Sequence, residues 1–336
     1  MLKNKFQATY NDIFQSQFLD SMLSLKIEGN ILITGAQGMI GNALACAINE
    51  LLSNQILNGV RLILCSRDWK PANLEYWKNF KNVENVTNFN LLNNYKSIDL
   101  VIHTASPSNI TKIKRIDDLR IPNIELLKNI FNLNPQKILY ISSGEVYGGG
   151  DTFENQHSKK FSYEITRDWY PLIKIETEDT LRNFGEVYDV KTIVIRLFHT
   201  YGPGLKVNDG RSFADILWGA VNEKLIILNS SGEQTRSFLY VSDAVKGILK
   251  TLFTSQHKQI TLNLGSDMPL KIIEFAKLVS IQTGASIVVK VNNSFKHSPN
   301  DYVVPELKAI KDFNWDPIID INTGITNTIR WMKKTF

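Results

Sequence analysis

Residues 31–41 read ILITGAQGMIG, and this stretch decides the fold class of the chain. The apolar run 31–34 predicts a short buried strand, and residues 42–52 predict a helix behind it. A turn rich in glycine joins the two. A helix that begins directly after a strand offers free N–H groups and a positive dipole end to a phosphate. The stretch therefore predicts the first unit of a dinucleotide-binding fold.

Three glycines suit this turn to a bound cofactor. They are Gly35, Gly38 and Gly41, in the spacing G-x-x-G-x-x-G rather than the more common G-x-G-x-x-G. Glycine permits a tight turn, close approach of the backbone to a pyrophosphate, and close packing of the helix on the strand. We therefore expect all three to line a dinucleotide.

The pattern outside this unit continues in the same way. Apolar runs at 60–65, 100–103, 137–142 and 192–198 predict further strands, and the segments between them are long enough for helices. Continuous apolar strands that alternate with helices form a parallel sheet covered on both faces. We therefore expect an α/β fold, a Rossmann-type doubly wound parallel sheet that binds its ligand at the carboxyl ends of the strands.

The chain divides into three expected parts. Residues 1–28 predict an N-terminal helical extension, and 29–200 the dinucleotide-binding domain. Residues 201–336 predict mainly a smaller α/β lobe for substrate, although parts of 236–265 return to the Rossmann sheet. Within this part we expect helices at 241–254, 270–283 and 321–334 and a strand at 261–264.

Composition excludes several classes of protein. Of the 336 residues 43% are hydrophobic and 21% are charged, which excludes a disordered, collagen-like or coiled-coil chain. No apolar stretch is long enough to cross a membrane. The net charge of +5 is mild and the basic residues are spread along the chain, so we expect no nucleic-acid partner.

The cysteines and histidines give two further expectations. Cys46 and Cys65 lie inside apolar runs and lack zinc-site spacing, which predicts buried, reduced thiols. The N-terminal residues lack the features of a signal peptide, so we expect a cytoplasmic protein. The 5 histidines show no ligand spacing, and we expect no metal.

The end of the second predicted strand bears on cofactor choice. NAD-binding folds usually place an acidic residue there for the ribose hydroxyls. Here the sequence is Ser66-Arg67, and Arg67 is suited to the 2′-phosphate of NADP. This feature alone leaves NAD and NADP equally open.

A tyrosine and a lysine form the candidate catalytic pair. Tyr170 and Lys174 are four residues apart, so on a helix they share one face. Free tyrosine is a poor base at neutral pH, and we expect the lysine ammonium and a nicotinamide cation beside it to lower the tyrosine pKa. Ser143, at the end of an earlier strand, would donate a hydrogen bond to the oxygen from which Tyr170 removes a proton.

These motifs together resemble an extended short-chain dehydrogenase/reductase of the NAD-dependent epimerase/dehydratase family, which acts on nucleotide sugars. The likeness covers residues 30 to about 330. The motifs that carry it are TGAQGMIG at 34–41, IHTAS at 102–106, ISSGEVYG at 141–148, YPLIK at 170–174, RLFHTYGPG at 196–204 and GEQTRSFLYVSD at 232–243.

The resemblance implies roles for individual residues. The catalytic set would be Ser143, Glu145, Tyr170, Lys174 and Asn123, the last supporting the lysine through a water. The cofactor would be contacted by Gly35, Gln37, Gly38, Met39, Ile40, Gly41, Arg67, Asn90, Leu91, Ala105, Tyr170, Lys174 and His199. The nucleotide sugar would be contacted by Ser106, Glu145, His199, Asp209, Arg211 and Arg236, with Arg236 on its pyrophosphate.

Variable positions narrow the reaction. The NDGR segment at 208–211 and Glu145 are similar to UDP-glucuronate decarboxylases. Gly144 stands where dehydratases have an aspartate that expels a hydroxyl, and decarboxylases usually have serine there. His199 replaces the usual asparagine of its motif, and Ile173 the usual serine. The expected function is therefore a UDP-glucuronate decarboxylase-like enzyme that works through a 4-keto intermediate with bound nicotinamide.

Other reactions stay open. The same residues suit an NDP-sugar 4-epimerase, a 4,6-dehydratase or an NADPH-dependent 4-keto reductase, and a non-catalytic dinucleotide-binding sensor is a remote alternative. The expected cofactor is NAD, with NADP open because of Arg67. We further expect a homodimer and a role in glycan biosynthesis.

Overall fold

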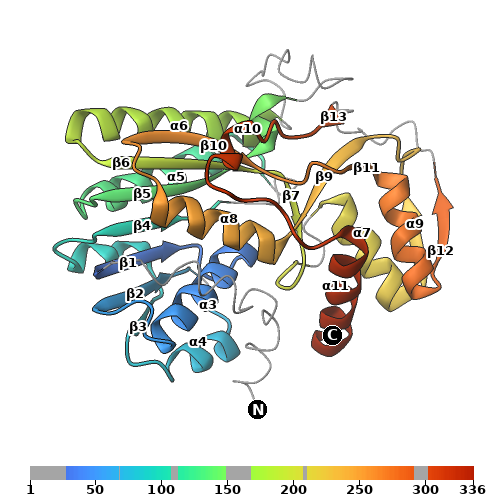
Figure 1. Cartoon of the computed structure of the whole chain (residues 1–336), viewed down its shortest axis with the longest axis horizontal. Helices are drawn as coiled ribbons and strands as arrows, with labels where there is room; N and C mark the ends of the chain where they lie inside the picture. The colour runs from blue at the N-terminus through green and yellow to red at the C-terminus, as the bar shows by residue number, and fades with distance from the viewer. Residues whose placement is uncertain (1–27, 68, 107–112, 149–167, 207–209, 291–301) are drawn as a thin grey trace.

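The computed structural model describes residues 28–67, 69–106, 113–148, 168–206, 210–290 and 302–336. Its centre is a seven-stranded sheet in the order β10-β6-β5-β4-β1-β2-β3, with every neighbouring pair parallel (Figure 1). The strands are β1 (Gly29–Thr34), β2 (Val60–Cys65), β3 (Val83–Val86), β4 (Leu100–His103), β5 (Lys137–Ser143), β6 (Lys191–Leu197) and β10 (Gln259–Leu264). The predicted doubly wound α/β fold is confirmed.

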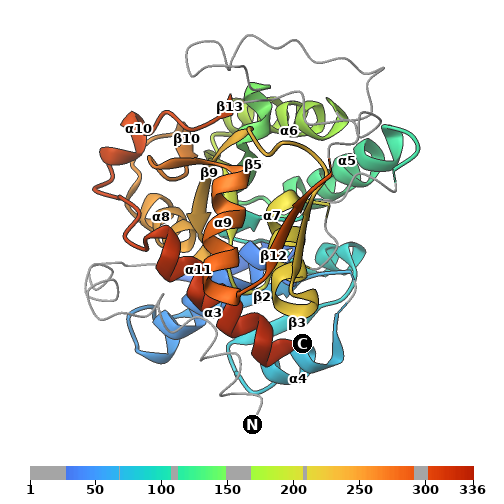
Figure 2. The same cartoon turned by 90° about the vertical axis from the view of Figure 1, so that its right-hand side faces the viewer.

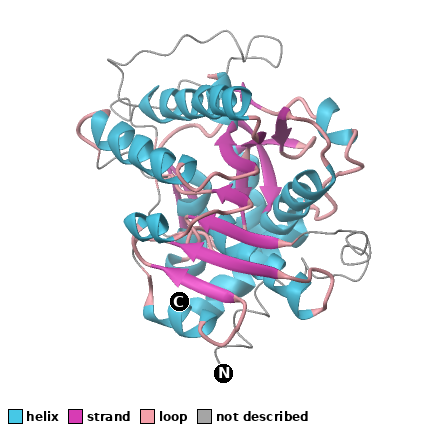
Figure 3. Ribbon diagram, turned by 90° about the vertical axis from the view of Figure 1, so that its left-hand side faces the viewer, coloured by secondary structure: helices cyan, strands magenta, loops and turns pink. Residues whose placement is uncertain are grey.

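Helices cover both faces of this sheet (Figure 3). One face packs against α3 (Met39–Ser53) and α8 (Val241–Thr254), the other against α5 (Asp117–Phe131) and α6 (Trp169–Tyr188). Successive strand residues point to opposite faces, so Ile31 and Ile33 belong to the first core and Leu32 to the second. The shorter helices near this sheet are α4 (Pro71–Trp77), η1 (Phe89–Asn94) and η2 (Gly144–Tyr147). Two apolar layers explain why the strands are apolar throughout.

The strand order reverses at β1. From there the chain runs outward to β2 and β3 on one side, and then from β4 to β5 and β6 on the other. The carboxyl ends of β1 and β4 lie side by side, with Thr34 paired to His103. Ligands of such sheets bind in the crevice at this reversal, so the fold itself marks the edge where the site should lie.

A second lobe follows β6. Figure 1 shows it at the right of the sheet, and Figure 2 shows α9, α11 and β12 from its outer side. Its strands are β7 (His199–Tyr201), β8 (Leu225–Leu228), β9 (Thr235–Tyr240), β11 (Pro269–Lys271), β12 (Ser286–Val289) and β13 (Tyr302–Val303). Its helices are α7 (Ser212–Trp218), η4 (Gly219–Glu223), α9 (Ile272–Thr283) and α11 (Ile321–Thr335), whereas α10 (Lys308–Lys311) lies against β10 of the main sheet (Figure 1).

Strand β9 is the centre of this lobe. It pairs with β11, β13 and β7, so that His199 lies opposite Phe238, and Val303 opposite Arg236. Between β9 and β11 the chain returns to the main sheet as α8 and β10. The two lobes are therefore interleaved in sequence.

The last described segment is fastened to the start of α8. The Trp315 side chain donates a hydrogen bond to the Asp243 carbonyl at 3.1 Å. The backbone N–H groups of Ile318 and Ile319 donate to one oxygen of the Asp243 carboxylate at 3.0 and 2.8 Å. One acidic residue thus fixes the path of the chain into α11.

Several boundaries differ slightly from those predicted. The first helix begins at Met39, three residues before the predicted start, because Gly38 is its extended N-cap. Strand β5 continues through Ser143. The predicted helix at 1–28 lies outside the described residues, apart from its last position. Cys46 and Cys65 are both buried and unpaired, as expected. Within the described ranges, no helix has both the length and the apolar character needed to cross a membrane.

Candidate active site

Two glycines at the turn after β1, Gly35 and Gly41, leave no room for a side chain. Gly35 has a φ of +73°, and a Cβ there would lie 2.7 Å from the Ala105 backbone nitrogen. A Cβ on Gly41 would lie 2.4 Å from the Gly35 oxygen and 2.7 Å from Thr104 Oγ1. Thr104 also donates to the Thr34 oxygen at 2.7 Å, which ties the ends of β4 and β1 together.

The start of α3 is open to an anion. Its N-cap, Gly38, supplies no side-chain hydrogen bond, and the first turn holds no acidic residue. The first N–H groups of a helix and its dipole attract phosphate when no side chain competes. The close-packed glycine turn and this uncapped helix start fit the pyrophosphate of a dinucleotide.

The other cofactor positions lie on loops at the same edge. Arg67 is exposed just after β2, and Asn90 and Leu91 are exposed on η1. The Asn90 N–H donates to Asn88 Oδ1 at 2.9 Å. Gln37 uses its side chain within the protein, since its Oε1 accepts a hydrogen bond from the Lys70 N–H at 2.7 Å. Gln37 therefore joins the glycine turn to the loop after β2.

Tyr170, Lys174 and Ser143 come together where α6 passes the end of β5. Lys174 is buried, and its Nζ donates to the Ile141 carbonyl at 2.7 Å. The same Nζ lies 5.7 Å from the centre of the Tyr170 ring. Tyr170 is half-buried and shares a hydrogen bond with Ser143. The geometry brings a phenol, a hydroxyl and an amine to the carboxyl edge of the sheet.

Burial is the main influence on the pKa values of Lys174 and Tyr170. Burial lowers the pKa of Lys174 to about 7, and the nearby Glu178 carboxylate partly offsets this. Burial raises the pKa of Tyr170, and it is the Ser143 hydrogen bond and the positive charge of Arg211 that oppose the rise. In the protein without ligands the cation that opposes the rise is Arg211 of the second lobe. The lowering of the Tyr170 pKa by Lys174 together with a nicotinamide cation stays a prediction.

Four charged or polar side chains form the other half of the site. His199 Nε2 lies 3.9 Å from Glu145 Oε1, between the end of β6 and η2. Arg211 precedes α7 and Arg236 lies on β9, and the charges of both act on His199. Together with burial they hold the His199 pKa well below its usual range, so the ring is neutral. Both lobes contribute to this group, which we call the acid–base cluster: Glu145, His199, Arg211 and Arg236.

Gly144 lies against an aromatic ring. A Cβ at this position would be 2.8 Å from three ring atoms of Phe198, which is itself buried. Any side chain there would have to displace the ring. The lack of an acid at position 144 is therefore built into the packing of η2 on the end of β6.

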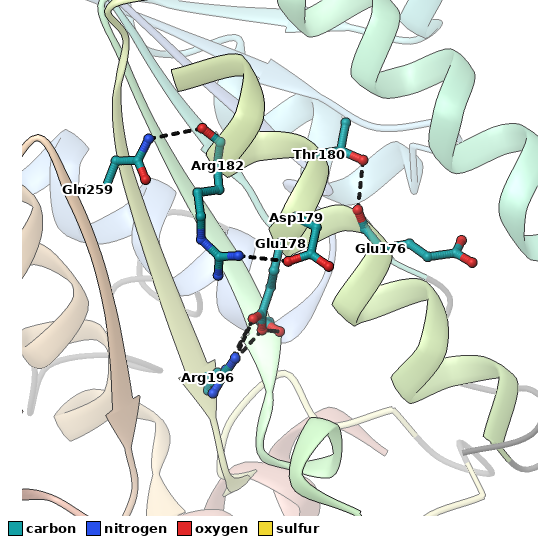
Figure 4. A network of polar contacts seen from close by, with 8 residues as sticks. Glu176, Glu178, Asp179, Thr180, Arg182, Arg196 and Gln259 are labelled. Carbon is teal, nitrogen blue, oxygen red and sulfur yellow. Dashed lines mark hydrogen bonds and ion pairs between the residues drawn. The ribbon is translucent and has the colours of Figure 1, made fainter. Parts of the chain in front are cut away.

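A buried ion pair lies next to the candidate catalytic residues. Arg196 donates three hydrogen bonds to Glu178, at 2.6 to 3.2 Å (Figure 4). Glu178 also accepts one from Ser142, next to Ser143. The pair links α6, β5 and β6. Glu178 lies four residues after Lys174, and Arg196 opens the RLFHTYGPG motif; those positions are the signal that the sequence analysis missed.

Asn123 does not contact Lys174. Its side-chain amide donates to Thr177 Oγ1 at 2.8 Å, and that hydroxyl donates to the Ile173 carbonyl at 2.7 Å. Asn123 therefore braces α6 against α5, and its link to the lysine through a water stays a prediction. Ser106 is exposed after β4, while Asp209 lies outside the described residues. Among the described residues, no group of three or more His, Cys, Asp and Glu side chains is arranged to hold a metal ion.

Comparison with known proteins agrees with this architecture. The model of the "NAD dependent epimerase/dehydratase family" matches residues 31–265. UDP-glucuronic acid decarboxylase 1 of Xenopus tropicalis is 25% identical over 99% of this chain and 79% of its own length. The dTDP-4-dehydro-6-deoxyglucose reductase of Escherichia coli is 27% identical, over 91% of this chain and 98% of its own.

Solved structures share the fold at lower identity. The UDP-glucuronic acid 4-epimerase of Bacillus cereus, in complex with UDP-glucuronic acid and NAD, matches with a TM-score of 0.74 and 18% identity. The alignment covers 91% of this chain and 100% of the epimerase. Epimerase Mth375 of Methanothermobacter thermautotrophicus matches with a TM-score of 0.78 and 18% identity, over 95% and 96% of the two chains.

Proposed function

Because the chain belongs to the NAD-dependent epimerase/dehydratase family, we propose that it modifies a nucleotide sugar through a 4-keto intermediate, and that its reaction is the decarboxylation of UDP-glucuronate. The likeness to UDP-glucuronic acid decarboxylases over nearly the whole chain supports the substrate.

The contact between Phe198 and Gly144 argues against a 4,6-dehydratase. A 4,6-elimination needs an acid at the leaving hydroxyl, and position 144, where such an acid would stand, has room for no side chain. Decarboxylation needs no such acid, because carbon dioxide leaves without a proton. Glu145, next to Ser143, remains as the carboxylate that handles the proton which the sugar carbon must later accept.

Each catalytic residue then has one task. When bound, the nicotinamide supplies a reversible acceptor for the hydrogen at carbon 4 of the sugar. Tyr170 takes the proton of the 4-hydroxyl and later returns it. Ser143 donates a hydrogen bond to the same oxygen, and the positive charge of Arg211 favours a phenolate. Lys174 Nζ lies 5.7 Å from the centre of the Tyr170 ring, and its ammonium form would add to this effect once the nicotinamide is bound. Arg236 holds the diphosphate by a charge-assisted contact.

A mass-spectrometric screen of UDP-, dTDP-, GDP- and CDP-sugars tests this function. We expect UDP-glucuronate to lose the mass of one carbon dioxide and to give a pentose nucleotide. Efficient loss of water from dTDP-glucose would contradict the decarboxylase assignment in favour of a dehydratase. A product of unchanged mass would indicate an epimerase, and a gain of two hydrogens from NADPH would indicate a reductase.

NAD rather than NADP is the proposed cofactor. The NAD dependence of the family supports NAD, while the exposed Arg67 after β2 keeps the 2′-phosphate of NADP as the alternative. The cofactor released by denaturing the purified protein can be identified by mass. Retained NAD supports a closed redox cycle, whereas no retained cofactor and a preference for NADPH would favour the reductase. If the protein binds neither NAD nor NADP, the proposal of NAD and the alternative of NADP are both wrong.

Two further expectations are kept as proposals. Exposed Ile121 and Ile124 on α5 offer apolar surface for a homodimer, which light scattering would test. The buried, unpaired cysteines support a reducing, cytoplasmic location. Fractionation of cells that produce the protein would test that location.

A further inference from the structure

His199 is placed as a proton carrier rather than as a packing residue. Its ring lies edge-on to Phe213 and Phe238, with centroids 6.0 and 6.2 Å away. Its Nε2 is 3.9 Å from Glu145 Oε1, and its Nδ1 is buried with no hydrogen-bond partner in the described part of the chain. An imidazole with one nitrogen beside a carboxylate and the other unpartnered can gain and lose a proton without breaking structure.

The charged groups that face His199 come from three elements. Glu145 approaches from η2, Arg211 from the start of α7, and Arg236 from β9. The two arginines repel a proton from the ring, whereas the carboxylate of Glu145 would attract one. Without a ligand, the arginines and burial prevail, and the His199 pKa stays well below its usual value.

An anionic ligand weakens two of the three influences that hold the His199 pKa down, while burial, the largest of them, remains. A diphosphate or carboxylate that binds at Arg211 and Arg236 offsets their positive charge, and the field that remains at the ring is that of Glu145. The pKa of His199 must then rise. Asparagine, which the related motif carries at this position, has no group that could respond in this way.

We propose that His199 takes up one proton when the nucleotide sugar binds, and supplies it through Glu145 to the sugar carbon that loses carbon dioxide; this inference rests on the proposed function. In the chemical step the bond from carbon 5 to the carboxylate breaks, and its electron pair stays on the sugar as an enolate. One proton passes from His199 Nε2 to Glu145, and from Glu145 to carbon 5. The proton would cross the 3.9 Å between the two side chains through a water.

This route balances the reaction. Release of carbon dioxide from a carboxylate consumes one proton, and the ring returns to its neutral form when it has delivered that proton. Solvent restores the proton when the next anionic substrate binds. His199 thereby has the proton in place before the enolate forms.

Calorimetry of ligand binding tests the uptake without turnover. The Tyr170→Phe protein is titrated with UDP-glucuronate near pH 7, in buffers that differ in ionisation enthalpy, because the variation in heat gives the number of protons taken up. We expect a measurable net uptake of protons on binding. Adding His199→Asn should abolish the uptake while binding persists. His257→Asn, which changes an exposed histidine, should leave it unchanged.

The outcomes separate this inference from the proposed function. Binding of UDP-glucuronate without proton uptake, or equal uptake in the His199→Asn protein, would overturn the role of His199 even if the enzyme makes a pentose nucleotide. Uptake on binding of UDP alone, in a protein that forms no pentose product, would contradict decarboxylation but support the uptake. If neither ligand binds, both proposals fail.

A second variant and a pH series keep the proposal testable if the His199→Asn protein does not fold. His199→Gln in the same background should also take up no proton. In the parent protein the uptake should fall as pH rises through the pKa of the ring in the complex, because the ring then stays neutral in both states. An uptake that does not change with pH would contradict a titrating histidine.

Discussion

The phenolic oxygen of Tyr170 is the proposed general base, and its removal should affect turnover but not the binding of UDP. Tyr170→Phe keeps the ring but removes the group that would accept the 4-hydroxyl proton. We expect kcat to fall by about 10²–10⁴-fold, as for loss of a general base, while the Kd for UDP changes little. Steady-state kinetics and calorimetry measure the two effects. Tyr188→Phe, at the exposed end of α6, is the matched control. Turnover within a few-fold of the unaltered protein would show that the base is another residue.

Lys174 makes stability depend on pH. Burial lowers its pKa from 10.5 to about 7, so between these values the unfolded chain holds the proton more often than the folded one. Stability from this residue should therefore increase as pH rises through that window and be lost as pH falls toward 7. The gain is at most about 1.4 kcal/mol for each pH unit crossed.

The measurement compares two proteins. Denaturant unfolding of the cofactor-free protein and of Lys174→Met, at several pH values, isolates the contribution of this amine. Lys334→Met, on the exposed end of α11, should follow the unaltered protein. If the difference between the protein and Lys174→Met is the same at every pH, the lysine does not titrate in this range.

At the scale of the elements, two substitutions in the glycine turn should differ in how much they lower stability and weaken NAD binding. A Cβ at Gly41 would meet backbone at 2.4 Å, whereas one at Gly38 would come no closer than 3.2 Å to the Gly35 oxygen. Gly41→Ala should force α3 away from β1, at a cost of about 1–3 kcal/mol, and should weaken NAD binding. Gly38→Ala should be milder. Thermal unfolding with and without NAD ranks the two, and equal effects would contradict the close packing.

The ion pair between α6 and β6 allows a similar comparison. Glu178 is almost fully buried, so Glu178→Gln leaves Arg196 without its counter-charge and should cost about 3–5 kcal/mol. Asp179→Asn breaks the neighbouring exposed pair with Arg182 (Figure 4), which should cost about 1 kcal/mol or less. Chemical denaturation measures both. Similar losses would mean that burial does not distinguish the two pairs.

The sequence predicts elements better than contacts between them. The strands β2 and β4 have the predicted bounds, because a continuous apolar run has few other places in a soluble fold. The short, half-polar strand β3 was missed, since VENV carries little apolar signal. The pairing of Phe198 with Gly144 and the effect of Arg211 on Tyr170 join residues far apart in sequence. No local sequence pattern reveals contacts of this kind.

On the scale of the whole molecule, the proposed substrate connects the two lobes. The cofactor turn belongs to the parallel sheet, whereas Arg236 is a buried residue of β9. Arg236→Ala should raise the Kd for UDP by about tenfold or more, as expected for loss of a charge-assisted contact, and leave NAD binding intact. Arg330→Ala, on the exposed face of α11, is the control. Calorimetry with each ligand measures the two Kd values. An unchanged Kd for UDP would contradict the role of Arg236 in substrate binding.

The pairing of Val303 with Arg236 has a consequence for synthesis on the ribosome. The strands around the glycine turn leave the exit tunnel early, but β9 gains β13 as a neighbour only after residues 302 and 303 have emerged. The hydrogen bonds from the N–H groups of Ile318 and Ile319 to the Asp243 carboxylate form later still. A nascent chain stalled before residue 302 has emerged should already expose the glycine turn that we propose binds the dinucleotide, while β9, which carries Arg236, still lacks β13 as a neighbour. Cofactor capture can therefore precede competence for the sugar during translation.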